Sequence, residues 1–483
     1  MGFQAAFLFD ASPRLGAGHA MRCLALADRL AAFGWKCTLV TPAEARRTVP
    51  AVERAGHALA LPDSWDGGAD LVVIDDYRRG SADEAGLRAA GRRILAIDDL
   101  ADRAHDCDIL LDQTHGRGAD DYRALVPAGC QVLTGAAMAL LRPEFLRRRA
   151  EAQARRATGV PPGRILISLG ATDPVNATAA ALDAAAIAFP HAKLDVVLGG
   201  SAPFLAELRA RVAALGPRAA LHVDTDAMAD LMVAADLAIG AAGSSAWERC
   251  VLALPTVMIV TADNQRLVAA NLARTGAAVL AGAHDALTVA GLADILGALT
   301  PPSLAEMSRR AGEVCDGRGA QRLLCALAGT AVGRDGRPVT LRLAGPGDVM
   351  TVLEWQRHPE TRRFARNPAI PDEMSHRRWM AAKLADPDTF FCIVQHGEDP
   401  AGMVRLDRAD GTSPTFEVSI FTAPERYGLG VGQAALALLD RACGGALLVA
   451  EVLAGNDASM RLFQRAGYTA IRTGLFHRLP LSC

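Results

Sequence analysis

The strongest constraint on the fold is an alternation of short β-rich runs and amphipathic helical stretches. Early in the chain the β-rich runs end at polar residues: "AAFLFD" at Asp10, "KCTLVT" at Thr41, "DLVVIDDY" at Tyr77 and "RRILAIDD" at Asp99, followed by "CDILLDQT" and "CQVLTG". Strands that alternate with helices predict parallel βαβ units, in which ligands bind at the carboxyl ends of the strands. The polar residues at these ends are therefore the informative ones.

A second alternating series follows a charged stretch with Pro and Gly, "RRRAEAQARRATGVPPG" at residues 147–163. It begins with "RILISLGATDP" and continues through "KLDVVLGG", "ALHVDT", "ADLAIGAAG" and "LPTVMIV" to about residue 330. The repetition predicts two Rossmann-like halves, residues 1–150 and 151–330, which face each other across a cleft.

A third domain is predicted at residues 339–483. The stretch "AVGRDGRP" at residues 331–338 is rich in Gly and charge, which indicates a linker. After it, "FFCIVQ", "AGMVRLDR" and "TFEVSIF" predict an antiparallel meander followed by helices. The expected fold class is thus α/β, two Rossmann-like domains followed by an α+β domain.

Composition excludes several classes of protein. Lys and Arg number 51 against 53 Asp and Glu, so no overall attraction to nucleic acid or membrane surfaces is expected. The 10 cysteines form no C-x-x-C pair, which argues against a zinc clamp or a disulfide framework. The start of the chain lacks a basic leader, and the longest apolar run, "VLALPTVMIVTA", is too short to cross a bilayer. We expect a cytoplasmic protein with no metal, no nucleic-acid partner and no membrane partner.

The stretch "GAGHAMRCLALADRL" places Gly16, Gly18 and His19 at the start of an apolar helical repeat. Glycines allow tight bends and close approach of a ligand to the backbone. The first turn of a helix offers unpaired N–H groups and a partial positive charge, which suit a phosphate. His19 would then lie beside an anionic ligand, where an imidazole can act as a general base. The alternative is a helix start with no ligand.

Two further strand ends carry candidate residues. In "IDDYRRG", Asp75, Asp76 and Tyr77 end a strand and either cap the next turn or, in the case of the tyrosine, order a substrate. In "SLGATDP", Gly170 belongs to a small-residue turn that is explained equally well by a simple connection between strand and helix.

The block "GAAGSSAWERCVLALPTVMIVTADNQ" combines a strand end, a glycine and a helix start. Ser244 and Ser245 suit a nucleotide phosphate, and Glu248, one turn further on, can accept two hydrogen bonds from a ribose diol. Asn264 and Gln265 follow the next strand. The alternative is structural, with Ser244 as an N-cap and Glu248 as its capping-box partner.

Together these motifs resemble the UDP-sugar hydrolases of pseudaminic acid biosynthesis, which share the two-domain glycosyltransferase-B architecture. The resemblance covers about residues 1–330 and implies cleavage of UDP-2,4-diacetamido-2,4,6-trideoxy-β-L-altropyranose to the free sugar and UDP. It implies that His19 and Tyr77 are catalytic. It also implies contacts to the UDP-sugar from Gly16, Gly18, Arg22, Gly170, Gly243, Ser244, Ser245, Glu248, Asn264 and Gln265.

The C-terminal stretches "PERYGLGVGQAALALLDRA" and "NDASMRLFQRAGY" resemble the GNAT acetyltransferase superfamily over about residues 339–480. In that superfamily the amides of a glycine loop bind the pyrophosphate of acetyl-CoA, which is the cosubstrate expected here. The resemblance implies that acetyl-CoA contacts Arg426, Leu429, Gly430, Val431, Gly432, Asn456 and Ser459.

The match to this superfamily departs from its pattern at two positions. Tyr427 stands where Gln or Arg usually precedes the first glycine, and Phe463 replaces a tyrosine that often acts as the general acid. Glu417 and Ser419, on "TFEVSIF", are candidates to order the amine or to accept its proton, and Glu417 is otherwise an outward-facing strand residue. Trp355, Trp379, Phe390 and Phe391 are expected in the core.

The two resemblances predict one bifunctional enzyme, in which the acetyltransferase domain acetylates the 4-amino group of the UDP-sugar before the hydrolase domain removes UDP. The predicted partners are these small molecules. Alternatives are a UDP-dependent glycosyltransferase, a nucleotide-sugar-binding scaffold without turnover, and a hydrolase of a related diacetamido sugar with an acetyltransferase domain of other amine specificity.

Overall fold

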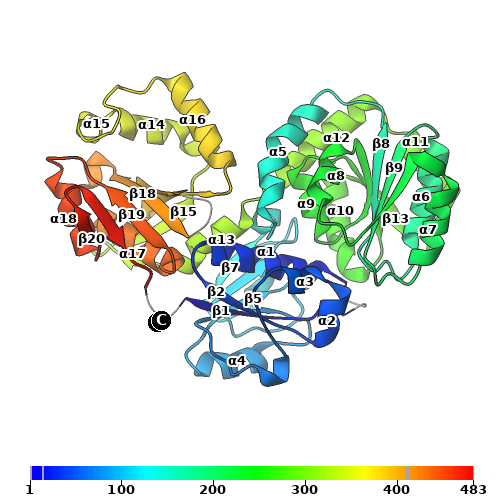
Figure 1. Ribbon diagram of the computed structural model, residues 1–483, viewed down its shortest axis with the longest axis horizontal. Helices are drawn as coiled ribbons and strands as arrows, with labels where there is room; N and C mark the ends of the chain where they lie inside the picture. Colours follow the sequence, from blue (N-terminus) through cyan, green and yellow to red (C-terminus); the bar gives the residue numbers. More distant parts are fainter. Residues whose placement is uncertain (1–2, 13–15, 410–413, 482–483) are drawn as a thin grey trace. The chain divides into compact units, whose positions relative to one another are not determined.

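The computed structural model describes residues 3–12, 16–409 and 414–481, and the chain divides into two compact units (Figure 1). The first, called here the cleft unit, comprises Ala5–Asp28 and Cys37–Gly319. The second, called the C-terminal unit, comprises Met1–Gln4, Arg29–Lys36 and Ala320–Cys483.

The first half of the cleft unit is built on a seven-stranded sheet with the order β3-β2-β1-β4-β5-β6-β7. The paired strands that flank β1 on the β4 side all run parallel. The strands are β1 (Gln4–Phe9), β2 (Lys36–Val40), β3 (Ala58–Ala60), β4 (Leu71–Asp75), β5 (Arg93–Ile97), β6 (Ile109–Asp112) and β7 (Gln131–Thr134). The helices are α1 (Gly18–Ala32), α2 (Ala43–Thr48), α3 (Ala51–Arg54) and α4 (Ser81–Ala89).

The second half repeats the plan with a six-stranded parallel sheet of order β10-β9-β8-β11-β12-β13. Its strands are β8 (Arg164–Ser168), β9 (Lys193–Leu198), β10 (Ala219–Val223), β11 (Leu237–Ala241), β12 (Thr256–Val260) and β13 (Val279–Ala283). Its helices are α5 (Pro143–Arg156), α6 (Ala177–Ala188), α7 (Leu205–Ala214), α8 (Met228–Ala234), α9 (Ser245–Val251), α10 (Arg266–Arg274), α11 (Val289–Gly297) and α12 (Pro301–Val314).

The apolar composition of these segments suits the central strands of a parallel sheet, where both faces are buried. All five residues of β4, "LVVID", and of β11, "LAIGA", are buried, as expected for strands covered by helices on both faces. Asp75 is the one charged residue in these two strands, and it stands at the last position of β4. The apolar run fixes the strand, and the polar residue falls at its carboxyl end.

The charged stretch expected to separate the two halves forms helix α5, which packs on α8, α9 and α12 of the second half (Figure 1). Phe145 and Ala152 of α5 are fully buried in the core of that half. Arg149 and Arg156 donate to backbone carbonyls there, Arg149 to Val251 O at 2.8 Å and Arg156 to Leu252 O at 2.6 Å. The basic residues of this stretch therefore anchor the helix to its neighbours.

The C-terminal unit contains an eight-stranded sheet with the order β14-β15-β16-β17-β18-β19-β21-β20. The pairs from β14 to β18 are antiparallel, which confirms the predicted meander, and β18 pairs in parallel with β19. The strands are β14 (Ala331–Val332), β15 (Pro338–Leu343), β16 (Thr389–His396), β17 (Asp399–Arg408), β18 (Thr415–Thr422), β19 (Leu447–Glu451), β20 (Thr469–Arg472) and β21 (Leu475–Arg478). The helices are α13 (Gly319–Ala328), α14 (Val349–Arg357), α15 (Pro359–Arg363), α16 (Glu373–Ala385), α17 (Val431–Cys443) and α18 (Asp457–Arg465).

The predicted linker at residues 331–338 is instead a hairpin of this sheet. Ala331 pairs with Val339 and Val332 pairs with Pro338, so the Gly-rich residues between them form its turn. The same composition suits a linker and a hairpin turn, and the strand pairing decides between them.

Residues from the end of α1 belong to the core of the C-terminal unit. Phe33 is 1% exposed and stacks on Phe416 of β18, with ring centroids 4.8 Å apart. Gly34 has a φ of +85°, and a Cβ atom there would lie 1.9 Å from Gly445 O, so only glycine fits. The segment Arg29–Lys36 is thus an integral part of the C-terminal unit.

The predicted fold class is confirmed, as is the burial of Phe390, Phe391 and Trp355, while Trp379 packs half-buried against the same core. Among the described residues, no helix is both long and apolar enough to cross a membrane. Within that same part of the chain, no group of three or more His, Cys, Asp or Glu side chains is arranged to hold a metal ion.

Candidate active sites

A cavity of about 950 Å³ lies in the cleft unit and is lined by loops that follow the carboxyl ends of strands in both sheets. Loops after β1, β4, β5 and β6 contribute from the first half, and loops after β8, β9, β10, β11 and β12 contribute from the second. The cavity brings together all of the residues that the sequence predicted for the UDP-sugar: Gly16, Gly18, His19, Arg22, Tyr77, Gly170, Gly243, Ser244, Ser245, Glu248, Asn264 and Gln265.

His19 occupies the first turn of α1 at the edge of this cavity. Its side chain is 7% exposed, and its Nδ1 atom is buried without a hydrogen-bond partner, 3.9 Å from Asp75 Oδ1. The imidazole packs edge-on against the ring of Tyr77, with centroids 4.7 Å apart. The imidazole is thus buried between a carboxylate and an aromatic ring.

Arg22, one turn further along α1, is held by two carboxylates. Its Nε and Nη2 atoms both donate to Asp75 at 2.6 Å, and Nη1 donates to Asp99 Oδ2 at 3.0 Å. Burial opposes ionisation of Asp75, but the Arg22 guanidinium outweighs it and holds the pKa of Asp75 below its usual value. The guanidinium thus fixes the carboxylate beside His19, although the sequence suggested only a contact to the UDP-sugar.

Tyr77 is hydrogen-bonded on both sides of its hydroxyl group. The hydroxyl donates to Asp99 Oδ1 at 2.7 Å and accepts from Asn264 Nδ2 at 3.1 Å. Burial and the negative charge of Asp99 raise the pKa of Tyr77 well above its usual value, so the phenol keeps its proton at neutral pH. Because Asn264 follows β12, this bond joins the two halves of the cleft unit.

The opposite wall of the cavity is the start of α9. Helix α9 begins after Ser244, which makes no side-chain capping bond, so the capping-box alternative is not observed. A Cβ atom on Gly18 would lie 3.3 Å from Ser244 Oγ, which shows how closely the glycine loop approaches this wall. Ser245 Oγ accepts from Arg249 Nη1 at 3.0 Å.

Glu248 is half-buried in the same wall. Its side chain is 15% exposed, and Arg142 lies 3.9 Å from Oε1. Burial raises the pKa of Glu248, while Arg142 and Arg249 oppose the rise. A carboxylate in this position can accept hydrogen bonds from the two hydroxyl groups of a diol, which take the place of water.

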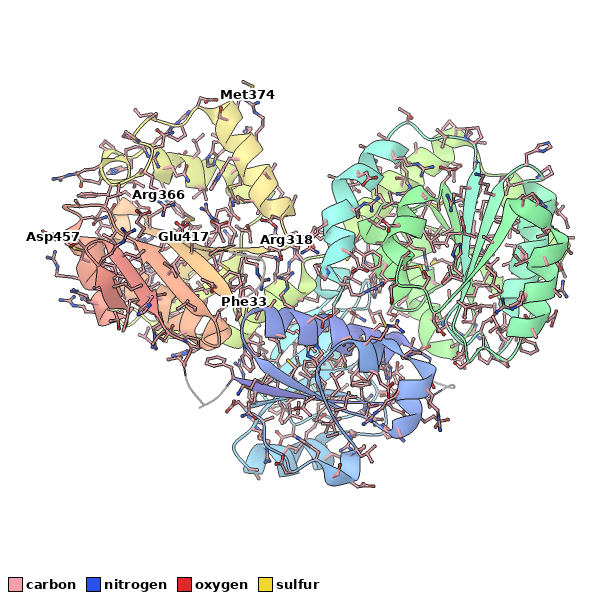
Figure 2. The ribbon with its side chains drawn as sticks, viewed as in Figure 1. Phe33, Arg318, Arg366, Met374, Glu417 and Asp457 are labelled. Carbon is pink, nitrogen blue, oxygen red and sulfur yellow. The ribbon has the colours of Figure 1, made fainter. Side chains whose placement is uncertain are left out.

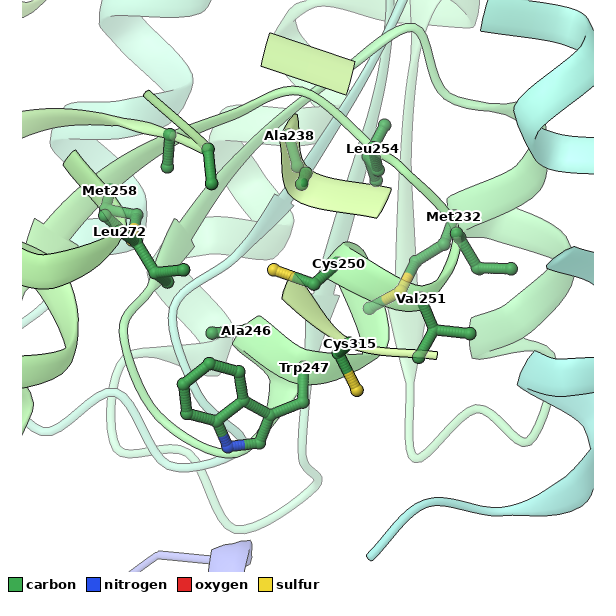
Figure 3. Close-up of a cluster of buried hydrophobic side chains, with 14 of the residues drawn as sticks. Met232, Ala238, Ala246, Trp247, Cys250, Val251, Leu254, Met258, Leu272 and Cys315 are labelled. Carbon is green, nitrogen blue, oxygen red and sulfur yellow. The ribbon is translucent and has the colours of Figure 1, made fainter. Parts of the chain in front are cut away.

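The buried face of α9 fixes these residues in place. Trp247, Cys250 and Val251 belong to a cluster of buried side chains that includes Met232, Leu254 and Cys315 (Figure 3). Trp247 also lines the cavity, so the cluster directly supports the cavity wall that α9 forms. In the turn that follows β12, Gln265 Oε1 accepts a hydrogen bond from the Thr261 amide at 3.0 Å.

Sequence reasoning missed some cavity residues. The sequence marked Asp99 only as the end of a strand. Its place at the end of "AIDD", directly after Asp98, is the signal that could have identified it as a cavity residue. Arg54 and Asp226 also line the cavity and form an ion pair of 2.8 Å across it. No sequence signal marked either of them.

His105 is an internal residue of the first half of the cleft unit. It is 4% exposed, and Nδ1 lies 2.7 Å from Glu84 Oε1. Both side chains are buried, so they form an internal pair of the first half. His115 is half-buried, and its backbone carbonyl accepts from Asn271 Nδ2 at 2.7 Å.

In the C-terminal unit, the glycine loop precedes α17. Gly428 and Gly430 have φ values of +79° and +80°, and Gly430 is the residue before the helix. The turn of the β14–β15 hairpin supports the loop, with Arg334 N donating to Leu429 O at 2.8 Å. Val431 is 1% exposed and therefore anchors the helix in the core, and Gly432 lies against Leu462 and Thr422.

The other residues predicted to contact acetyl-CoA have structural partners. Arg426 Nη2 donates to Asp399 Oδ2 at 3.0 Å. Asn456 caps α18 by accepting from the amide of Ser459 at 3.1 Å. Tyr427, which stands before the glycines where the GNAT pattern usually has Gln or Arg, is 51% exposed. Phe463 is buried against Tyr468.

The two candidates for acetyl transfer lie on one face of β18. Glu417 forms an ion pair with Arg366, and Ser419 Oγ accepts from Arg405 Nη2 at 3.3 Å. Figure 2 shows Arg366 and Glu417 beside each other at the sheet.

Residues 339–469 match the model of a family described as an acetyltransferase (GNAT) domain. The C-terminal unit carries a GNAT domain. The chain is also 28% identical over 278 residues to the UDP-2,4-diacetamido-2,4,6-trideoxy-beta-L-altropyranose hydrolase of Campylobacter jejuni, covering 56% of this chain and 96% of the relative. These findings confirm the predicted resemblance of both parts and the enzyme class of each. The chain pairs a region similar to a sugar-nucleotide hydrolase with a GNAT acetyltransferase domain.

The chain is also similar to two solved structures. MurG of Acinetobacter baumannii is 17% identical, with a TM-score of 0.47 over 66% of this chain and 98% of that one. The GNAT domain of PAT from S. lividans is 24% identical, with a TM-score of 0.26 over 31% of this chain and 93% of that one.

Proposed function

We propose that the cleft unit hydrolyses UDP-2,4-diacetamido-2,4,6-trideoxy-β-L-altropyranose to the free sugar and UDP. The observation that carries the proposal is the convergence, in one cavity, of a buried imidazole and a half-buried Glu248 on opposite walls. The similarity to the Campylobacter hydrolase over the same part of the chain supports it.

In this proposal His19 takes a proton from water as the water oxygen bonds to the anomeric carbon. The bond from that carbon to the diphosphate oxygen breaks, and UDP leaves with the electron pair. Because a diphosphate is a much weaker base than an alkoxide, the leaving group needs little acid assistance, unlike ordinary glycoside hydrolysis with its two carboxyl groups. Asp75 stabilises the imidazolium that forms, and the Arg22 clamp keeps Asp75 ionised.

The other residues bind the substrate. Glu248 accepts from the ribose hydroxyls, and the amides around Gly243, Ser244 and Ser245 face the diphosphate. Gly16 and Gly18 let the backbone approach the same group, and Gly170, Asn264 and Gln265 complete the wall. Tyr77, whose hydroxyl is occupied by Asp99 and Asn264, orders the sugar beside His19.

The test is a comparison of His19→Asn with the wild type. Removal of a general base lowers kcat by roughly 100- to 10,000-fold, and KM changes little. The assay follows UDP and free reducing sugar by mass spectrometry in the absence of any acceptor. His222→Asn, in the second half and paired with Asp195, is the matched control and keeps full activity.

Each alternative gives a different result in this assay. A glycosyltransferase releases no reducing sugar until an acceptor is added, and a scaffold releases neither product. A hydrolase of a related diacetamido sugar prefers that UDP-sugar over the altrose derivative. Unchanged turnover in His19→Asn removes the histidine from the mechanism.

We further propose that the GNAT domain uses acetyl-CoA to acetylate the 4-amino group of the UDP-sugar that precedes the hydrolase substrate. The match of residues 339–469 to the GNAT model supports acetyl-CoA as the cosubstrate. In the expected contact, the amides of Leu429, Gly430, Val431 and Gly432 bind the pyrophosphate at the start of α17. Incubation of the full chain with acetyl-CoA and the UDP-4-amino sugar, followed by thiol and UDP measurements, tests both steps.

A further inference from the structure

Strands β18 and β19 pair in parallel only near their starts. Thr415 pairs with Leu447, Phe416 with Leu448 and Glu417 with Val449. Beyond that point β18 pairs with β17 and β19 pairs with β21, and no further pairs between β18 and β19 are formed by the described residues. The two strands therefore open a gap in the sheet just after Glu417.

Two carboxylates flank this gap. Residues that pair directly across strands share a face, and residues two apart on one strand share it too. Glu417 lies opposite Val449, so Glu451, two residues further along β19, is on the face of Glu417 and Ser419. Neither carboxylate is buried, because their side chains are 37% and 49% exposed.

Arg366 reaches into the same place from the segment between α15 and α16. Its Nη2 atom contacts both carboxylates, lying 2.6 Å from Glu451 Oε2 and forming a hydrogen bond with Glu417 Oε1. Arg362 and Arg357 shape this segment by donating to the carbonyls of Asn367 and Pro371, each at 3.0 Å. The segment thus presents Arg366 to the gap, as Figure 2 shows for Arg366 and Glu417.

The neighbouring cations on this face have a separate anionic partner. Arg405 Nε donates to Asp407 at 2.6 Å, and Lys383 Nζ donates to Asp407 at 2.7 Å. Among the ion pairs of the described residues, those of Glu417 and Glu451 are both with Arg366. Its side chain is 57% exposed, and exposed ion pairs are worth little, so a competing cation can displace it.

We propose that Arg366 holds the position of the acceptor's ammonium group between Glu417 and Glu451, and that the acceptor binds by displacing it. The inference rests on the acetyltransferase function proposed above and deepens it, because it assigns Glu451 and Arg366 to amine selection. The class of acceptor is a primary ammonium that fits between two carboxylates.

The reaction balances with these groups. The ammonium gives one proton to a carboxylate, and the free amine forms a bond to the carbonyl carbon of acetyl-CoA. The bond from that carbon to sulfur breaks, and the second proton passes from nitrogen to the thiolate. The products are the acetamide, CoA thiol and one proton released to solvent.

The test measures amine KM and kcat in the full chain by release of CoA thiol, with the UDP-4-amino sugar and with methylamine as acceptors. Arg366→Gln lowers KM for both amines by about 2- to 5-fold, the range of one exposed ion pair, and leaves kcat within twofold. Glu451→Gln raises KM by a similar factor. Arg377→Gln is the matched control, since Arg377 is equally exposed and pairs with Glu373 within α16.

The outcomes separate this inference from the proposed function. A KM that is unchanged or higher in Arg366→Gln overturns the inference while leaving the acetyltransferase intact. Transfer to methylamine but not to the UDP-amino sugar, with the lower KM in Arg366→Gln, supports the inference and rejects the proposed acceptor. Transfer to neither amine rejects both.

Discussion

The hydroxyl of Tyr77 accepts a hydrogen bond of 3.1 Å from Asn264, so a residue that follows β4 in the first sheet is joined to one that follows β12 in the second. The same hydroxyl donates to Asp99, which also accepts from Arg22. One chain of bonds thus runs from the second half of the cleft unit to the carboxylates beside His19.

This chain predicts energetic coupling between Tyr77 and Asn264. Tyr77→Phe and Asn264→Ala each lower kcat/KM for UDP release, because each removes the bond that positions the phenol ring. The double variant loses less than the sum of the two, with a coupling energy of about 0.5–3 kcal/mol. A double-mutant cycle on kcat/KM measures it, and purely additive losses would contradict the linkage.

Arg22→Met is predicted to destabilise the cleft unit strongly. The substitution leaves Asp75 buried without its cation, which typically costs about 3–5 kcal/mol. Urea unfolding at pH 7 measures the change in the free energy of unfolding. Arg211→Met, which removes an exposed ion pair with Asp183, is the control and costs about 0–1 kcal/mol. Equal losses in the two variants would show that burial of the Arg22 pair adds nothing.

The same variant has a defined pH dependence. In the wild type the folded pKa of Asp75 is lowered, so its contribution to stability is present above the unfolded pKa of about 4 and is lost as pH falls through the folded value. Without Arg22, burial raises that pKa, and protonation then favours the folded state. The difference in the free energy of unfolding between the wild type and Arg22→Met is therefore expected to become smaller as the pH falls from 7 to 4. A difference that grows on acidification would contradict this prediction.

Gly430→Ala is predicted to weaken acetyl-CoA binding. At a φ of +80° an alanine is strained, and its Cβ atom would lie 2.9 Å from Arg334 Cγ, so the loop before α17 must shift. We expect KM for acetyl-CoA to rise about 10-fold, equivalent to about 1.4 kcal/mol. Gly345→Ala, where no atom lies within 4 Å, is the control. An unchanged KM would place the pyrophosphate elsewhere.

Phe33→Ala is predicted to destabilise the C-terminal unit although it lies near the start of the chain. The ring is 1% exposed and packs on Phe416 and Phe390, and loss of such a ring typically costs about 3–5 kcal/mol. Hydrogen exchange of the β16 and β18 amides in the full chain measures the loss. Unchanged protection of these strands would show that Phe33 is not part of their core.

Much of the site was predictable because strand ends are encoded locally. The apolar run before Asp75 fixes β4, and chain geometry then places Asp75, Asp76 and Tyr77 at its carboxyl end, where ligands bind in parallel sheets. The same logic located Ser244 and Glu248 after β11. The glycines before α17 identified the expected acetyl-CoA loop in the same way.

What escaped prediction depends on pairs that are distant in the chain. Arg22 lines the cavity, but no local pattern showed that its guanidinium binds Asp75 and Asp99, which lie 53 and 77 residues away. No residue pattern near His105 in the sequence indicates that it forms a buried pair with Glu84. Arg366 lies in a segment without apolar period, so its place between Glu417 and Glu451 follows only from the pairing of β18 and β19.

The sequence by itself determined the order of strands and helices, the residues at strand ends and the resemblance to two enzyme families, because these depend on short-range periodicity and spacing. Only the tertiary structure decided that residues 331–338 form a hairpin, that Phe33 packs on β18 and that Arg22 clamps Asp75. The reason is physical: local pattern fixes which face of an element is apolar, whereas the partner of each buried charge or ring is chosen by packing across the whole unit.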